Sequence, residues 1–274
     1  MHYCVTPFWK NLTVLKSLSR KWQHLMRILL LASAVVIMTS FAKIKLTYFN
    51  IMGAAEKVRL AFAIKGIPFE DNRIAFPDWA GLKPSTKFGQ LPIMTLPTGE
   101  EIAQSDAMLR YVATLPEGAC LMPADPLAAL TVDEVLGLAA DMDKDWSPCL
   151  YISMRPENYG YPPEFKNTPE HQALIKRMRE TFMNEKMPTY MKYYENFLGD
   201  KSFICGPDVS IADCVIIPQL YKFMQGNLDY VGKDSLDRYP KILAYMKRFA
   251  ALPGVRQYEN SKGEGVSRMD ELTK

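Results

Sequence analysis

The sequence has few of the residues that proteins use to bind metals or to form disulfides. Its 274 residues include three histidines and five cysteines, which are scattered, and no two cysteines form a CxxC pair. This pattern argues against a metal site and predicts reduced thiols. A glycine-rich phosphate loop, internal repeats and low-complexity tracts are also missing. We therefore expect no metal cofactor and no phosphate-loop nucleotide site.

Acidic residues are absent from the first 55 positions, and the whole chain carries a net charge of +3. Five basic residues fall within the first 37 positions, and taking those five charges away from +3 leaves −2 for the remainder. The remainder lacks the basic surplus that is typical of nucleic-acid-binding proteins, so we expect no nucleic-acid partner.

The apolar run over residues 28–38 follows Arg27 and precedes small residues at 39–42. It is shorter than the about 20 residues that span a bilayer, and it resembles the core of a signal peptide. A signal anchor and a translation start at Met38 are the alternatives. We treat residues 1–43 as a leader, which would target the secretory pathway or an organelle, or anchor the chain to a membrane through residues 28–42. A chain that starts at Met38 would be cytoplasmic.

Residues 88–111 predict a strand, a turn, a second strand and a helix start. Leu91 precedes Pro92, and a cis bond there could turn the backbone N–H and C=O of Leu91 outward. Residues 97–99 read as a hairpin turn. Residues 104–106 read as a helix N-terminus, whose amide donors suit a carboxylate. This segment is organised to hold a small peptide, although an ordinary hairpin and cap would have the same pattern.

Upstream, residues 45–70 predict a strand, a tight turn and an amphipathic helix. The two segments together give the order β-α-β followed by β-β-α. Five motifs in these segments and beyond occur in one order along the chain. They are Thr47 to Asn50, Asp78–Trp79 with Lys83, Phe88 to Pro92, Gln104–Ser105, and Ser210 to Asp213.

The order and the residues of these motifs resemble those of the glutathione S-transferases, most of all the sigma, prostaglandin-D-synthase-like class. The resemblance covers nearly all of residues 44–260. It implies an α/β thioredoxin-like N-terminal domain at residues 44–121 and an all-α C-terminal helical domain at residues 127–262, followed by a polar tail at 263–274. Asp125–Pro126 marks the expected linker.

The rest of the chain agrees with a helical second domain. From Leu127 onward apolar residues recur at helical spacing, and no strand-like alternation of comparable length follows. Ser210 and Asp213 predict a helix cap, which is a structural role. A cluster of prolines predicts one long loop between helices. These prolines are Pro148, Pro156, Pro162, Pro163 and Pro169.

The resemblance implies reduced glutathione as co-substrate and a tyrosine that activates its thiol. Tyr48 matches the family's catalytic tyrosine, whose hydroxyl donates a hydrogen bond to the sulfur, although a strand tyrosine more often packs in a core. Other positions match residues that hold the rest of glutathione. These positions are Trp79, Lys83, Gln90, Leu91, Pro92, Gln104, Ser105 and, across a homodimer interface, Asp141, for which Asp143 and Asp145 are competitors.

A small hydrophobic electrophile is the implied second substrate. We expect its pocket to be lined by Phe49 and Met52 from the first domain and by Trp146 and Tyr151 from the second, since apolar residues suit such a site. The same residues could equally be core.

One position departs from the sigma pattern, because Ala54 stands where the family has an arginine. That arginine would favour the thiolate, so activation could be weaker here. Three hypotheses remain open: a glutathione transferase, a glutathione-dependent isomerase of prostaglandin type, and a non-catalytic glutathione-binding or structural protein.

Overall fold

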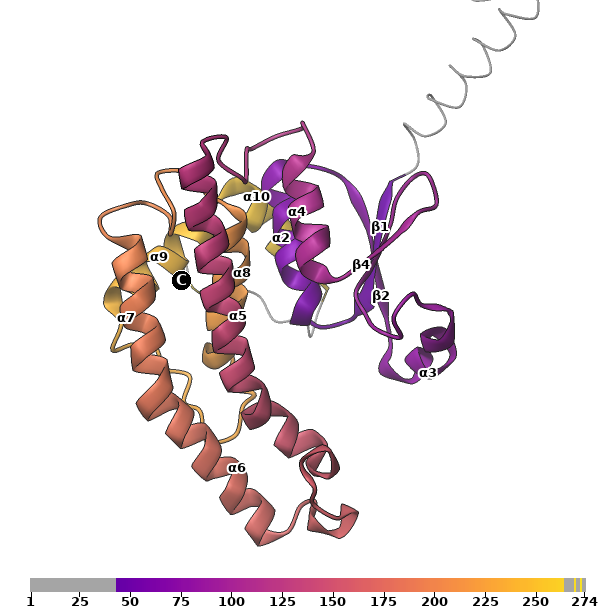
Figure 1. The fold of residues 1–274 in the computed structure, drawn as a ribbon, viewed down its shortest axis with the longest axis vertical. Coiled ribbons are helices and arrows are strands. Elements are labelled where there is room, and N and C mark those ends of the chain that lie inside the picture. The colour runs from indigo at the N-terminus through magenta and orange to yellow at the C-terminus, as the bar shows by residue number, and fades with distance from the viewer. Residues whose placement is uncertain (1–42, 264–268, 270–271, 273–274) are drawn as a thin grey trace, which may run out of the picture.

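The computed structural model describes residues 43–263 together with positions 269 and 272. The leader was expected at residues 1–43, and all of it except Lys43 lies outside the described residues, as does most of the polar tail. Within the described part, a small sheet domain is followed by a helical domain (Figure 1).

The sheet domain is built from four strands and three helices. The strands are β1 (Ile44–Phe49), β2 (Phe69–Ile74), β3 (Ile93–Thr95) and β4 (Glu101–Ala103), and the helices are α2 (Glu56–Lys65), α3 (Trp79–Leu82) and α4 (Ser105–Thr114). The strand order is β2-β1-β3-β4, with β1 and β2 parallel and the other neighbours antiparallel. This is the thioredoxin-like arrangement that the sequence predicted.

The helical domain follows Asp125, whose side chain accepts a hydrogen bond from the Ala128 N–H at 2.8 Å and so caps the first long helix. Its helices are α5 (Pro126–Met154), α6 (Pro169–Thr181), α7 (Met187–Leu198), α8 (Ile211–Tyr221), α9 (Pro240–Ala250) and α10 (Pro253–Ser261), with a π-helical stretch at Phe182–Lys186 between α6 and α7. The expected all-helical second domain is therefore confirmed.

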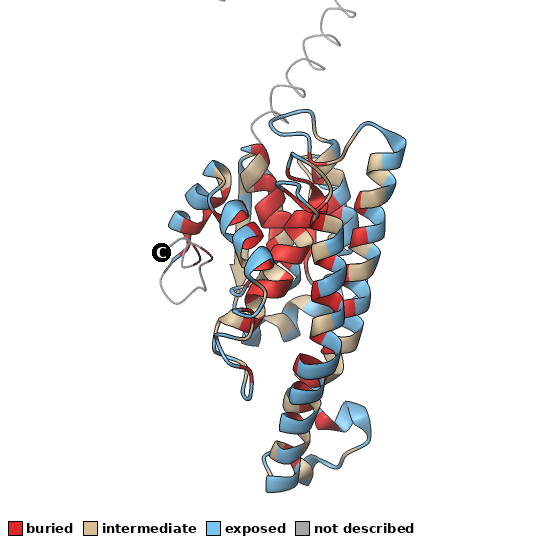
Figure 2. Ribbon diagram, turned by 90° about the vertical axis from the view of Figure 1, so that its left-hand side faces the viewer, coloured by how far each residue is buried: buried red, intermediate tan, exposed pale blue. Residues whose placement is uncertain are grey.

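Helix α2 lies at the centre of the molecule, where it contacts α4, α8 and α10. Its face is buried through Val58, Leu60 and Phe62, each fully enclosed. Figure 2 shows buried residues concentrated in this middle region, with more exposed residues toward the far ends of the long helices. The two domains thus share one continuous apolar core.

The proline cluster was only partly interpreted correctly. Pro148, the first proline assigned to the loop, lies inside α5. The helix therefore includes residues 148–154 and stops at Met154. The loop runs from 155 to 168 and contains two short 3-10 turns, Pro156–Tyr159 and Pro163–Phe165, while Pro169 opens α6. A proline removes one helical hydrogen bond, and in this long helix burial of residues on both sides of Pro148 outweighs that loss.

The predicted cap at the start of α8 is confirmed. The Asp213 carboxylate is fully buried and accepts hydrogen bonds from the Ser210 N–H at 2.7 Å and from the Ile204 N–H at 2.9 Å. It also accepts from the hydroxyls of Ser210 and Tyr245, at 2.9 and 2.6 Å. Asp213 therefore joins three segments of the helical core and has a structural role.

Candidate functional site

Tyr48 lies near the end of β1, where its hydroxyl contacts the following turn. The hydroxyl oxygen accepts a hydrogen bond from the Ala54 N–H at 3.2 Å. Gly53 makes this approach feasible, because a Cβ on Gly53 would stand 2.6 Å from the hydroxyl oxygen. The Gly53 backbone has φ +44°, in the left-handed region that glycine adopts without strain. Because the Ala54 bond uses a lone pair of the oxygen, the phenolic proton remains able to donate.

The electrostatic surroundings of Tyr48 keep its hydroxyl protonated. Burial raises its pKa above the ordinary value, and the negative charge that Tyr151 can carry acts in the same direction. The Ala54 N–H and the Arg59 guanidinium oppose this effect and lower the pKa. A phenol with a raised pKa is a neutral hydrogen-bond donor at pH 7 and not a base. The site can therefore stabilise an anion placed beside Tyr48.

Arg59 lies beside Tyr48, although the sequence analysis did not include it among the candidate site residues. It is fully buried on α2, and its guanidinium carbon lies 5.8 Å from the centre of the Tyr48 ring. A buried arginine within the apolar pattern of α2 was the available signal, because charged residues are rarely buried unless paired.

The expected peptide-binding segment has the predicted local structure. The Leu91–Pro92 bond is cis and leads directly into β3. The turn at residues 97–99 joins β3 to β4. Gln104 precedes the first residue of α4, Ser105, and has φ 72°. The Gln104 Nε2 lies 3.3 Å from the Gln90 Oε1, so the structure brings these two candidate residues together.

Trp79 and Lys83 come from α3 and the turn that follows it. The Trp79 ring packs edge-on against Phe49, with ring centres 6.1 Å apart, and is half-buried. Lys83 is exposed, and its side chain passes over Gly89, next to Gln90. These two residues and Gln90 therefore lie along one border of the sheet domain.

The three acidic candidates on α5 differ in their partners. Asp143 pairs with Lys222 at 2.8 Å, and Asp145 accepts from the Tyr190 hydroxyl at 2.9 Å and pairs with Lys186 at 3.4 Å. Asp141 is exposed and has no ion pair with the described residues of its own chain. Of the three, Asp141 is thus the one whose carboxylate remains available to a second molecule.

The residues expected to line an electrophile pocket differ in their exposure, and Trp146 is buried. The Trp146 side chain is 2% exposed and packs against Phe182 and Phe223, with ring centres 5.0 and 4.8 Å apart. Trp146 is therefore a core residue, and its assignment to an open pocket is wrong. Helical spacing could not separate these roles, because apolar residues occupy more than one face of α5.

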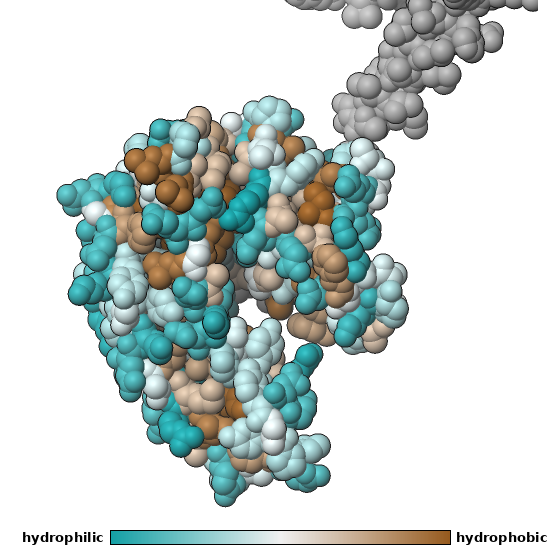
Figure 3. All heavy atoms as spheres, viewed as in Figure 1, coloured by the Kyte–Doolittle hydropathy of each residue, from teal (hydrophilic) through white to brown (hydrophobic). Residues whose placement is uncertain are grey.

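The other three pocket residues lie near Tyr48. Phe49 stacks on Phe76 at 4.5 Å, and the Phe76 ring is 63% exposed. Met52 is buried and its sulfur lies 3.1 Å from the Gln225 Nε2 of the helical domain. Tyr151 is 43% exposed and is close enough to Tyr48 to influence its pKa. Figure 3 shows a hollow between the sheet domain and the lower half of the helical domain, with apolar side chains on its sheet-domain side.

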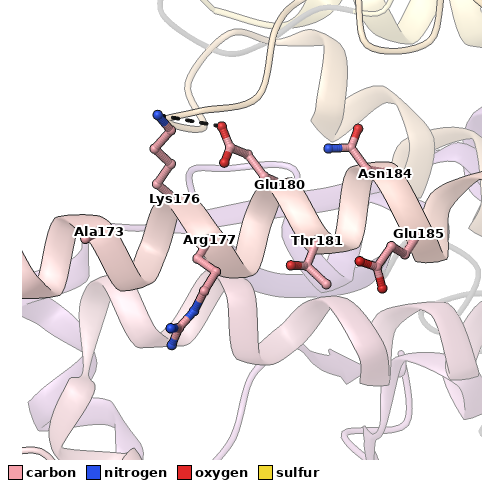
Figure 4. Close-up of a pocket in the computed structure, with 7 residues that line it drawn as sticks. All are labelled: Ala173, Lys176, Arg177, Glu180, Thr181, Asn184 and Glu185. Atoms are coloured by element: carbon pink, nitrogen blue, oxygen red, sulfur yellow. Dashed lines mark ion pairs between the residues drawn. The ribbon is translucent and has the colours of Figure 1, made fainter.

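Two further concave regions contain none of the candidate residues. One is a shallow depression of about 300 Å³ along α6 and the π-helical stretch, where Lys176 pairs with Glu180 (Figure 4). The other is a cavity of about 690 Å³ between β2 and the end of α10. In the described part of the chain, no cluster of His, Cys, Asp or Glu could hold a metal ion, and no helix is long and apolar enough to cross a membrane.

Comparisons with known proteins agree with this architecture. The family model described as "Glutathione S-transferase, N-terminal domain" matches residues 44–114, and "Glutathione S-transferase, C-terminal domain" matches residues 164–262. Hematopoietic prostaglandin D synthase of Gallus gallus is 30% identical over 211 residues, which are 77% of this chain and 92% of that protein. Glutathione S-transferase 1 of Ascaris suum is 28% identical over 78% of this chain and 94% of its own length.

Solved structures show the same likeness. The glutathione S-transferase from Ascaris lumbricoides superposes with a TM-score of 0.63 at 27% identity, covering 81% of this chain and 98% of the other. Rat hPGDS complexed with a quinoline gives a TM-score of 0.64 at 25% identity over the same shares. The chain therefore belongs to the glutathione S-transferase family and is an enzyme of the glutathione transferase class.

Proposed function

We propose that the chain binds reduced glutathione, lowers the pKa of its thiol through Tyr48 and delivers the thiolate to a small hydrophobic electrophile. A cysteine thiol has a reference pKa of about 8.5, so only a few per cent is thiolate at neutral pH. The observation that carries the proposal is the Tyr48 hydroxyl, which accepts from the Ala54 N–H and keeps its own proton to donate. A sulfur beside this hydroxyl would be stabilised as the anion.

The remaining contacts to glutathione in this proposal are those that the family resemblance implies. The Leu91 backbone before Pro92 pairs with the cysteinyl backbone. Gln104 and Ser105 hold the γ-glutamyl carboxylate at the start of α4, where the helix dipole favours an anion. The contact between the side chains of Gln104 and Gln90 supports this assignment, because it connects the start of α4 to the segment that contains Gln90.

The glycyl end of glutathione lies at the other end of that border. Lys83 supplies a cation for its carboxylate, and Trp79 and Gln90 flank it. The Lys83 side chain lies over Gly89, which precedes Gln90 in the sequence, and this position supports the role.

A homodimer completes the site in this proposal. Asp141 reaches across the interface to the glutamyl amine, supported by its exposure and by the internal partners of Asp143 and Asp145. Leu127 and Leu130 on the same helix are 72% and 55% exposed, which suits an apolar interface between two copies. Sedimentation of the purified chain at several concentrations tests this assembly.

The hydrophobic electrophile binds between Phe49 of the sheet domain and Tyr151 of the helical domain. A glutathione-dependent isomerase is the second candidate, favoured by the 30% identity to a prostaglandin D synthase. Such an enzyme would use the same thiolate and regenerate glutathione. Product analysis separates the two: a conjugate that consumes glutathione indicates transfer, and turnover at constant glutathione indicates isomerisation.

The decisive experiment follows the thiolate absorbance of bound glutathione against pH, with a chain that starts at Met38. We expect a thiol pKa below that of free glutathione, and we expect Tyr48→Phe to return it close to the free value. A Tyr48→Phe variant that keeps the full shift would refute the role of Tyr48.

A non-catalytic glutathione-binding protein is the outcome if glutathione binds with an unshifted pKa. Ala54→Arg then tests whether the missing arginine is the reason, because Ala54 is exposed and its N–H bond to Tyr48 does not involve the side chain. If the thiol pKa of bound glutathione is also unshifted in Ala54→Arg, the absence of the family arginine at position 54 does not explain why the thiol is not activated.

A further inference from the structure

A closed ring of charged and polar side chains joins α10 to α2 and β2. Arg59 lies 3.3 Å from the Glu56 Oε2 and 2.9 Å from the Asp71 Oδ1. Arg73 donates to the Asp71 Oδ2 at 2.8 Å and to the Tyr258 hydroxyl at 3.2 Å. The Tyr258 hydroxyl donates back to the Glu56 carboxylate at 3.1 Å, which closes the ring. Tyr258 is separated from Glu56 by 202 positions, so only the fold brings them together.

Lys262 attaches the end of the chain to this ring. Its ammonium lies 2.7 Å from the Glu56 Oε1 and 2.8 Å from the Glu259 Oε1. The other oxygen of Glu259 accepts from the Met269 N–H at 2.8 Å. The side chains of Glu56, Glu259 and Lys262 are almost fully buried, so these bonds form in a region of low dielectric where a lost partner is costly.

The opposite side of the ring holds the turn that follows Tyr48. Arg59 donates to the carbonyl oxygens of Ile51 at 2.7 Å, Met52 at 3.3 Å and Phe49 at 3.4 Å. These three carbonyls lie between Tyr48 and the Ala54 N–H that its hydroxyl contacts. The position of Arg59 therefore fixes the geometry of the turn on which the Tyr48 hydroxyl rests.

Three acidic and three basic side chains make up the charged part of this network, so their charges balance. The carboxylates are Glu56, Asp71 and Glu259, and the cations are Arg59, Arg73 and Lys262. Because its charges balance and its members bond to one another, the network is not suited to bind an additional ion. Its physical consequence is to restrict the position of Arg59 through several partners at once.

We propose that Tyr258 is a positioning residue for Tyr48, acting through Glu56 and Arg59 on the turn between Tyr48 and Ala54. The Tyr258 hydroxyl is the one group of the ring that binds both Glu56 and Arg73, so it forms a second link between α2 and β2 beside the Arg59–Asp71 pair. The effect of Tyr258 on catalysis depends on the proposed activation of glutathione. Its effect on the order of the turn between Tyr48 and Ala54 does not depend on that activation.

The test compares Tyr258→Phe with Tyr245→Phe. Both substitutions remove one buried hydroxyl that donates to a buried carboxylate, Glu56 in the first case and Asp213 in the second. Tyr245 lies on α9 and its hydroxyl contacts neither the ring nor Tyr48. Both variants should lose stability, and only Tyr258→Phe should affect the site.

The first measurement is amide hydrogen exchange of residues 49–55, which requires no ligand. Loss of one hydrogen bond to a charged group in the ring should accelerate exchange in this segment by about tenfold in Tyr258→Phe. Tyr245→Phe should leave it unchanged. Equal exchange in the wild type and Tyr258→Phe would overturn the proposal, as would equal acceleration in both variants.

The second measurement is the thiol pKa of bound glutathione, which should rise toward the free value in Tyr258→Phe alone. If the wild-type chain does not lower this pKa, the proposed function fails, while hydrogen exchange still decides the role of Tyr258. If Tyr258→Phe does not fold, Lys262→Gln and Lys262→Arg provide a second test of the same network. We expect faster exchange in Lys262→Gln and near wild-type exchange in Lys262→Arg, and an unchanged Lys262→Gln would contradict the coupling.

Discussion

Replacing Gly53 by alanine should inactivate the site while leaving the fold intact. The added Cβ would lie 2.6 Å from the Tyr48 hydroxyl oxygen and 2.7 Å from the Cε1 of the ring. Since ordinary carbon contacts are about 3.5 to 4.0 Å, the ring has to move by roughly 1 Å. That movement also lengthens the 3.2 Å bond from the Ala54 N–H.

Two separate magnitudes follow from this geometry. Alanine at φ +44° should reduce the free energy of unfolding by about 1 to 2 kcal/mol through backbone strain. A displacement of roughly 1 Å at a catalytic group can lower the rate by about a hundredfold. We expect Gly53→Ala to show both effects, measured by urea unfolding and by kcat/KM for conjugation of glutathione to an activated aryl chloride.

Gly66→Ala is the matched control, because Gly66 also has a positive φ, +66°, at the end of α2, and a Cβ there would meet nothing within 4 Å. It should lose similar stability and keep its activity. The reasoning is refuted if Gly53→Ala retains wild-type kcat/KM, or if Gly66→Ala loses activity to the same extent.

Three other predictions concern the helical domain and the thiols. Asp213→Ala leaves four donors without their acceptor and should lower the free energy of unfolding by about 3 kcal/mol or more in urea titrations; a loss below 1 kcal/mol would contradict the structural role. Burial raises the pKa of Cys205 to about 12, so its alkylation should rise by about a hundredfold between pH 8 and 10. The exposed Cys120 should be labelled first at pH 8, as peptide mass spectrometry would show, and faster labelling of Cys205 would be inconsistent with its burial. Asp141→Asn should weaken glutathione binding by about tenfold in calorimetry through loss of a charge-assisted contact, whereas Asp143→Asn, whose carboxylate is held by Lys222, should not; the reverse result would reassign the contact.

Features set by a few adjacent residues could be predicted from the sequence. The cap at Ser210 and Asp213 and the hairpin turn at 97–99 depend on local turn and cap chemistry, and the structure confirms them, as it confirms the position at which α4 starts. The domain order followed from periodicity and from motif order. For the cap, the hairpin turn and the helix start, the information lies within one turn of helix or one hairpin.

Features that depend on distant partners could not be predicted. Pro148 satisfies the local rule for ending a helix, yet α5 continues because residues on both sides of it are buried against other helices. Trp146 fits a pocket and a core equally well by spacing, and its neighbours Phe182 and Phe223 decide for the core. The bonds of Arg59 are to residues close to it in the sequence, but Tyr258, which binds its partner Glu56, lies in the last helix and has no signal near Arg59.

The absence of the family arginine at position 54 can be compared with the stabilisation that a hydrogen bond from Tyr48 would give a thiolate. Lowering the thiol pKa by one unit requires about 1.4 kcal/mol, and a hydrogen bond to a charged group contributes about 1.5 to 3 kcal/mol. Tyr48 alone can therefore account for one to two units, which would bring a thiol of pKa about 8.5 close to neutrality. Activation without the family arginine thus requires an accurately placed hydroxyl more than an added charge. In the proposed mechanism, the turn at Gly53 and the network around Arg59 would set the position of that hydroxyl.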